Sequence, residues 1–99
     1  MNIDILNLET AADTLKAIAH PIRISIVGLL DRGVELSVTE IHEALNIEQA
    51  VASHHLSILK NKNVLESNRV GKNCFYKLKH PQLAQVLICI ETCHKVNQQ

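Results

Sequence analysis

Two spacings of apolar residues divide the chain. Up to residue 61 they recur at the 3.6-residue period of amphipathic helices, which predicts helices over residues 10–19, 21–31, 38–45 and 48–61. From residue 64 to residue 79 they alternate, which predicts a β-hairpin with its turn at Gly71-Lys72-Asn73. A last helix is predicted over residues 82–96, after His80-Pro81. The expected order is helix, helix, helix, helix, hairpin, helix, in a single domain over residues 1–99.

Local signals mark several of these boundaries. Thr10 is the expected N-cap of the first helix, and Gly33 is the expected C-cap of the second. Residues 37–40, Ser-Val-Thr-Glu, form a capping box, in which the side chains of the serine and the glutamate each accept from the other's backbone amide. Asn63 is expected in the left-handed conformation after the fourth helix. His20 and His42 are interpreted as structural.

The helix over residues 48–61 has two unlike faces. Ala52, Leu56 and Leu59 form an apolar stripe that is expected to face the core. The other face carries short polar side chains and almost no acidic ones, and such a face suits the major groove of DNA. Its expected DNA-contacting residues are Gln49, Ala50, Ser53, His54, Ser57 and Lys60. We interpret residues 38–61 as a helix-turn-helix whose second helix recognises DNA.

Some of these residues admit a second interpretation. Gln49 either bonds an adenine edge or caps the helix. His55 lies near the apolar stripe and is interpreted as a packed residue, the alternative being a ligand. Arg69 and Lys72 at the hairpin tip either contact the DNA backbone or minor groove, or are solvated turn residues. A short helix, a tight turn, a polar-faced helix and a basic-tipped hairpin, in this order, predict a mostly α winged helix-turn-helix fold.

The net charge of the chain is zero, which counts against a strongly basic nucleic-acid binder. The charge is unevenly distributed, however: residues 46–79 carry six basic and two acidic residues, and the remainder carries the compensating acids. This distribution favours a local surface for DNA phosphates, the alternative being a chance group of solvated lysines. Phe75 and Tyr76 are the only aromatic residues, so recognition by base stacking is not expected.

Other features of the composition indicate where in the cell the protein is expected. Apolar residues make up 46% of the chain, but no stretch approaches the roughly 18 that a membrane span needs. The first ten residues lack the basic start of a signal peptide. Three cysteines, an odd number, argue against a secreted disulfide framework. We expect a cytoplasmic protein that does not contact membranes.

Four segments, residues 20–30, 35–41, 49–61 and 64–78, closely resemble the ArsR/SmtB family of bacterial metal- and redox-responsive transcriptional repressors. The Ser-His-His-Leu of residues 53–56 and the hairpin that ends in Tyr-Lys-Leu are the more specific parts. The resemblance covers about residues 10–95. It implies a homodimer formed through the first and last helices, which binds an imperfect palindrome in double-stranded DNA and is released by an inducer.

The residues with which members of this family sense their inducers are missing from the matching positions of this chain. Where many arsenic and cadmium sensors have Cys-Val-Cys, this chain has Ser37-Val38-Thr39, and neither hydroxyl is a soft-metal ligand. The positions used by zinc sensors hold His80, Gln82, Cys93 and Val96, which do not make a credible zinc site, so no metal site is predicted. The helix-two cysteine of the persulfide sensors corresponds to Gly28.

Cys89 and Cys93 remain, at i and i+4 on the last helix. They either share a metal or persulfide inducer or pack as small apolar residues in the dimer interface. Cys74, on the Tyr76-Leu78 face of the hairpin, is expected in the core. No cofactor is otherwise predicted.

Two other classes of function were weighed. The zero net charge suggests a winged-helix module that binds protein and has lost its DNA role. Cys89, Cys93 and His94 suggest a thiol enzyme, but no glycine-rich loop, oxyanion arrangement or carboxylate pair accompanies them. We therefore predict a DNA-binding repressor and not an enzyme.

Overall fold

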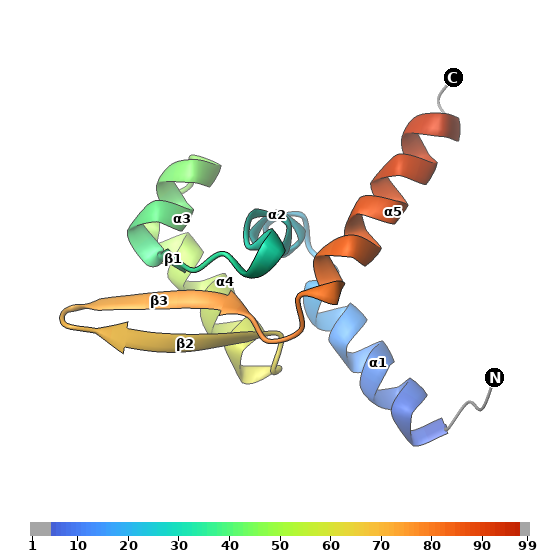
Figure 1. Cartoon of the computed structure of the whole chain (residues 1–99), viewed down its shortest axis with the longest axis horizontal. Coiled ribbons are helices and arrows are strands. Elements are labelled where there is room, and N and C mark those ends of the chain that lie inside the picture. Colours follow the sequence, from blue (N-terminus) through green and yellow to red (C-terminus); the bar gives the residue numbers. More distant parts are fainter. Residues whose placement is uncertain (1–4, 98–99) are drawn as a thin grey trace.

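The computed structural model describes residues 5–97, and the side chains of residues 8–93. Its elements are α1 (Ile5–Ile18), α2 (Pro21–Leu29), a 3₁₀ turn η1 (Asp31–Gly33), β1 (Leu36–Ser37), α3 (Val38–Leu45), α4 (Gln49–Asn61), β2 (Leu65–Val70), β3 (Asn73–Leu78) and α5 (Gln82–Asn97). Each predicted helix and strand is present in the predicted order (Figure 1). The mostly α winged helix-turn-helix fold is thereby confirmed.

The sheet has one strand more than the sequence predicted. Its strands are antiparallel in the order β1-β3-β2, and β1 pairs Leu36 with Tyr76 and Ser37 with Phe75. A two-residue strand leaves no alternation to detect, because an alternating pattern is recognised only over about four to eight residues. By pairing with β3, this strand fixes the start of α3 beside the hairpin.

Two predicted helix ends were wrong. α1 begins at Ile5, so Thr10 lies inside the helix, where its carbonyl accepts from the Thr14 hydroxyl at 3.1 Å. α2 ends at Leu29 with Leu30 as its C-cap, and Gly33, at φ 73°, instead closes η1. Gly33 thus has the left-handed conformation that glycine favours, but it lies four residues beyond the end of α2 because that helix ends earlier than predicted.

Other local predictions are confirmed. In the capping box the Glu40 amide donates to the Ser37 hydroxyl at 3.1 Å, and the Ser37 amide donates to the Glu40 carboxylate at 3.0 Å. Asn63 has φ 62°. The His20 ring caps α2 by accepting from the Ile22 amide at 3.1 Å.

The core lies where α2, α3, α4 and the sheet meet. Its largest fully buried side chains are Ile26, Val27, Leu30, Ile41, Leu56, Leu59, Val64 and Leu65. Tyr76 and Leu78 of β3 pack on this core as predicted, but Cys74, expected there as well, is only half-buried and lies outside it. The reason is the position of Cys74 near the hairpin turn, where β2 and β3 extend beyond the helices.

α1 and α5 project from the side opposite the hairpin (Figure 1). The radius of gyration is 14.5 Å, above the roughly 13 Å of a compact domain of this size. Leu15 is 56% exposed, although Ala17 and Ile18 in the same turn of α1 are buried, so Leu15 lies on the side of the helix that faces away from the core. Among the described side chains of these two helices, the other large apolar ones that are exposed are Leu8, Val86, Ile88 and Ile90.

Candidate DNA-binding surface

The turn between α3 and α4 is held by backbone geometry and one histidine. Asn46 adopts a left-handed conformation at φ 54°, which asparagine tolerates better than most residues. The Ile47 amide donates to the His42 carbonyl at 3.0 Å, and Nδ1 of His42 lies 3.2 Å from the Ile47 carbonyl oxygen. His42 is therefore structural, as predicted, and it fixes the angle at which α4 leaves α3.

α4 has the two faces that its sequence predicts. Ala52, Leu56 and Leu59 are fully buried. All of its predicted DNA-contacting residues are exposed: Gln49, Ala50, Ser53, His54, Ser57 and Lys60. Burial of the apolar stripe thus fixes which side of α4 faces outward, and that side is the polar one.

The alternative role of Gln49 is not supported. Glu48 is the N-cap of α4, and Gln49 is the first residue of the helix itself. The Gln49 side chain therefore does not occupy the capping position and is exposed at the start of the helix.

His55 is packed, as predicted. It is 7% exposed, and its Nδ1 accepts a hydrogen bond from Nε of Arg23 at 3.1 Å. Burial lowers the pKa of His55 below the usual 6.5, and the neighbouring His20, Arg23 and His54 lower it further. His55 thus serves the packed side of α4, whereas its neighbour His54 lies on the exposed side.

The turn of the hairpin lies close to the start of α4. Arg69 and Lys72 are exposed, and Gly71 takes φ 63° to make the tight turn. Gln49 and Lys72 line one shallow hollow of about 180 Å³, together with the start of α3. Two predicted DNA-contacting residues, 23 positions apart in the sequence, therefore share one surface.

That hollow adds residues that the sequence did not indicate. Thr39, in the first turn of α3, and Asn73, after the hairpin turn, are exposed and line it with Gln49 and Lys72. From the sequence, Thr39 stands out only as a position where related metal sensors have a cysteine. A different signal could have indicated its exposure near DNA: it lies two residues after the N-cap of α3, the first helix of the helix-turn-helix.

The local excess of positive charge is smaller on this surface than the sequence suggests. Nζ of Lys77 lies 3.3 Å from a carboxylate oxygen of Glu66 and 3.8 Å from one of Glu35, so its charge is balanced within the sheet. Lys62 lies beside α1 and α5, where it lines a separate groove with His80. Of the six basic residues of this region, four then remain, and all of them are exposed: Lys60, Arg69, Lys72 and Lys79.

The possible sensing residues lie elsewhere. Cys89 and Cys93 are both exposed on α5, and the side chain of His94 is outside the described residues. Among the described residues, no three His, Cys, Asp or Glu side chains gather as metal ligands do. No helix in the described part of the chain is long and apolar enough to cross a bilayer.

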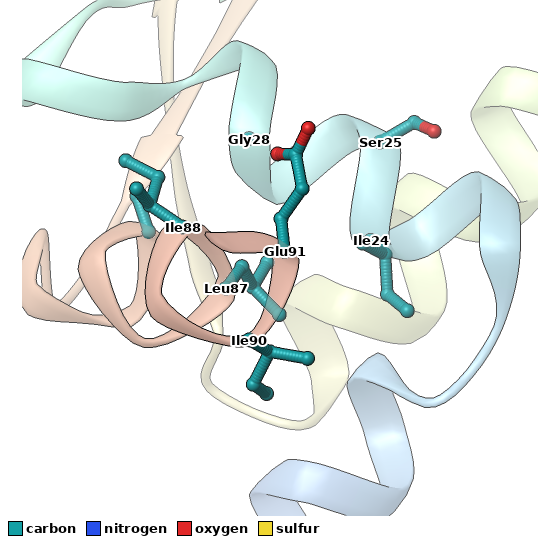
Figure 2. Close-up of a pocket in the computed structure, with 8 residues that line it drawn as sticks. Ile24, Ser25, Gly28, Leu87, Ile88, Ile90 and Glu91 are labelled. Carbon is teal, nitrogen blue, oxygen red and sulfur yellow. The ribbon is translucent and has the colours of Figure 1, made fainter. Parts of the chain in front are cut away.

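Gly28 lies on a groove between α2 and α5, where persulfide sensors of the resembled family would place a cysteine (Figure 2). The groove has a volume of about 490 Å³ and is lined by Ile24, Ser25, Gly28, Ala84, Leu87, Ile88, Ile90 and Glu91. Neither Cys89 nor Cys93 lines it, so a dithiol of that type does not form here.

Known proteins share this sequence and fold. A helix-turn-helix domain matches residues 18–67, half of the chain. The transcriptional repressor PagR of Bacillus anthracis is 35% identical over 85 residues, which cover 86% of this chain and 85% of that protein. The HTH-type transcriptional regulator NmtR of Mycobacterium tuberculosis is 38% identical over 77% of this chain, which spans 62% of the length of NmtR.

Two solved structures extend the likeness to the whole fold. The PagR crystal structure has a TM-score of 0.78 to this structure at 33% sequence identity. The matched region is 88% of this chain and 99% of the PagR chain. The second structure is Mb0332 of Mycobacterium bovis, described as a homodimeric winged helix-turn-helix DNA-binding domain and a possible ArsR-family regulator. It has a TM-score of 0.78 at 26% identity, and the match covers 95% of this chain and 86% of that chain.

Fold and surface together define a winged helix-turn-helix DNA-binding protein. The chain belongs to the ArsR/SmtB family of transcriptional repressors.

Proposed function

We propose that this chain is a homodimeric repressor that binds a palindromic operator through α4 and the hairpin. The single observation that carries the proposal is the division of α4 into a buried apolar side and an exposed polar side. Gln49, Ala50, Ser53, His54, Ser57 and Lys60 are proposed to enter the major groove. Arg69 and Lys72 contact the DNA backbone or the minor groove, and no catalysis is involved.

The homodimer is supported by the exposed apolar side chains of α1 and α5, among them Leu8, Leu15 and Ile90. Covering them removes apolar surface from water, which is the main driving force of association. Both helices lie opposite the hairpin, so a partner there leaves α4 accessible (Figure 1). A two-fold axis at this face sets two copies of α4 on one duplex, and a palindrome matches that symmetry.

The proposed inducer site is Cys89 and Cys93. One helical turn separates them, and both thiols are exposed. A metal or a persulfide is the class of inducer that two such thiols hold. Their position on α5 places any adduct on a helix of the proposed dimer interface.

The test is a salt titration of binding to a duplex from the gene's own promoter, against a random duplex of equal length. Specific binding that weakens steeply with salt is expected, because phosphate contacts release counterions. Ser53→Ala with His54→Ala should remove the preference for the promoter and leave the dimer intact. Equal affinity for both duplexes would instead favour a winged-helix module that binds protein.

A further inference from the structure

His20 and Arg23, three positions apart in the sequence, meet His55 on the packed side of α4. Nε of Arg23 on α2 donates to Nδ1 of His55 on α4 at 3.1 Å, and Nη1 of the same arginine donates to the Ala17 carbonyl of α1 at 3.1 Å. The ring of His20, between α1 and α2, lies against that of His55 with centroids 4.6 Å apart. The guanidinium of Arg23 therefore connects three helices at one point.

The chemistry of this contact requires a neutral histidine. A guanidinium only donates hydrogen bonds and stays charged at all ordinary pH values, so Nδ1 of His55 must offer its lone pair. A proton on Nδ1 removes that acceptor and places a positive charge against Arg23. The contact is then lost and the two charges repel each other.

We propose that Arg23 and His55 are positioning residues that hold α4 against the corner between α1 and α2, and that protonation of His55 releases this hold and weakens DNA binding. The inference rests on the proposed function, since it takes α4 as the DNA-reading helix. His54, on the exposed side of the same helix, is adjacent to the groove-facing residues, so movement of His55 displaces the polar face directly.

The groups around His55 favour its neutral form at pH 7. Burial lowers its pKa, and the charges that lower it further come from the α1–α2 corner (His20), from α2 (Arg23) and from α4 itself (His54). Since the folded-state pKa lies below that of the unfolded chain, the contact is complete above about pH 6.5, the unfolded value, and is lost as the pH falls through the lower pKa of the folded protein.

Two further histidine rings lie beside His55. The ring centroid of His20 is 4.6 Å away and that of His54 is 5.3 Å away, so only a variant at position 55 isolates the contact with Arg23.

The decisive variant is His55→Gln, whose amide oxygen accepts from Arg23 and does not titrate. Affinity for the promoter duplex is measured at pH 7.5 and 5.5, at one salt concentration, with folding confirmed by circular dichroism. We expect His55→Gln to match the wild type at pH 7.5 and to bind more tightly than it at pH 5.5, by less than about tenfold because the pKa of His55 lies below 6.5. His55→Leu, which lacks an acceptor, should bind more weakly than both at pH 7.5, where His55 is neutral, and more weakly than His55→Gln at pH 5.5.

The matched control is His80→Gln, which removes an exposed histidine outside the contact. It should follow the wild type at both pH values. The proposal is overturned if His55→Gln and the wild type lose or gain the same factor between pH 7.5 and 5.5.

A second measurement separates this inference from the proposed function. Urea unfolding without DNA should show that the wild type loses more stability than His55→Gln between pH 7.5 and 5.5. If no protein prefers the promoter duplex at either pH, the proposed function fails. An equal loss of stability in the two proteins then overturns the positioning role as well.

Discussion

Gln49, the first residue of α4, and Lys72, in the turn of the hairpin, line the same hollow on the surface of the molecule. Neither residue is near the other in sequence, and β1 makes the meeting possible. This short strand pairs with β3 and so fixes the start of α3 beside the hairpin. The base-reading and phosphate-contacting parts of the proposed DNA surface are thus rigidly joined.

The two residues should differ in their effect on DNA binding. Lys72→Ala removes one phosphate contact, so it should weaken binding to all duplexes alike and reduce the salt slope by about 1. Gln49→Ala should leave the slope unchanged and reduce the preference for the promoter by roughly 1–3 kcal/mol. Lys77→Ala is the control, because Glu35 and Glu66 already balance that charge. A slope equally reduced in Lys77→Ala would contradict this assignment.

A charge on α1 should separate the proposed dimer. Burial of one leucine side chain contributes roughly 1.5–3 kcal/mol, and two-fold symmetry counts it twice. Leu15→Glu should therefore raise the dimer dissociation constant by about a hundredfold or more. Light scattering after gel filtration measures the change.

Val70→Glu is the control for this experiment. Val70 is 59% exposed on the hairpin and Leu15 is 56% exposed on α1, so the two variants add the same charge at equally accessible positions. Only the change on α1 should produce monomers. Dimers that survive in Leu15→Glu would place the interface elsewhere.

The inducer site makes a separate prediction. Cys89→Ser with Cys93→Ser should leave the affinity for the promoter duplex within about twofold, because neither residue lies on the proposed DNA surface. A twofold change is well below the 1.4 kcal/mol that corresponds to a tenfold change in affinity. The double variant should lose any release from DNA by metals or persulfides. Cys74→Ser should keep it, and a double variant that still responds would assign both cysteines to packing.

The capping box should contribute measurably to stability. Ser37→Ala leaves the Glu40 amide without its acceptor and should cost about 1 kcal/mol in urea unfolding. Thr39→Ala, at an exposed position in the same helix, should change stability by less than about 0.5 kcal/mol. A Ser37→Ala protein as stable as Thr39→Ala would mean that water replaces the cap without cost.

Gly28 should be replaceable with a gain in stability. It lies inside α2, and a Cβ at this position would meet no atom within 4 Å. Since glycine inside a helix costs roughly 0.5–1 kcal/mol relative to alanine, Gly28→Ala should stabilise the protein by about that amount in urea unfolding. A loss of stability would show that the groove between α2 and α5 is filled in solution.

The sequence by itself determined the order of the elements and the outward side of α4. Both follow from local periodicity: the spacing of Ala52, Leu56 and Leu59 defines the buried side of the helix, and the polar residues must then lie on the other. The capping box and the left-handed Asn63 were equally local, since each depends on a few consecutive residues.

Only the tertiary structure decided which of these residues meet. β1 is too short for an alternating pattern to be detected, and the contact between Arg23 and His55 joins residues 32 positions apart. The charge of Lys77 was counted toward DNA until its partners across the sheet were known. Pairings between distant residues depend on how helices and strands pack, and no pattern along the chain records that packing.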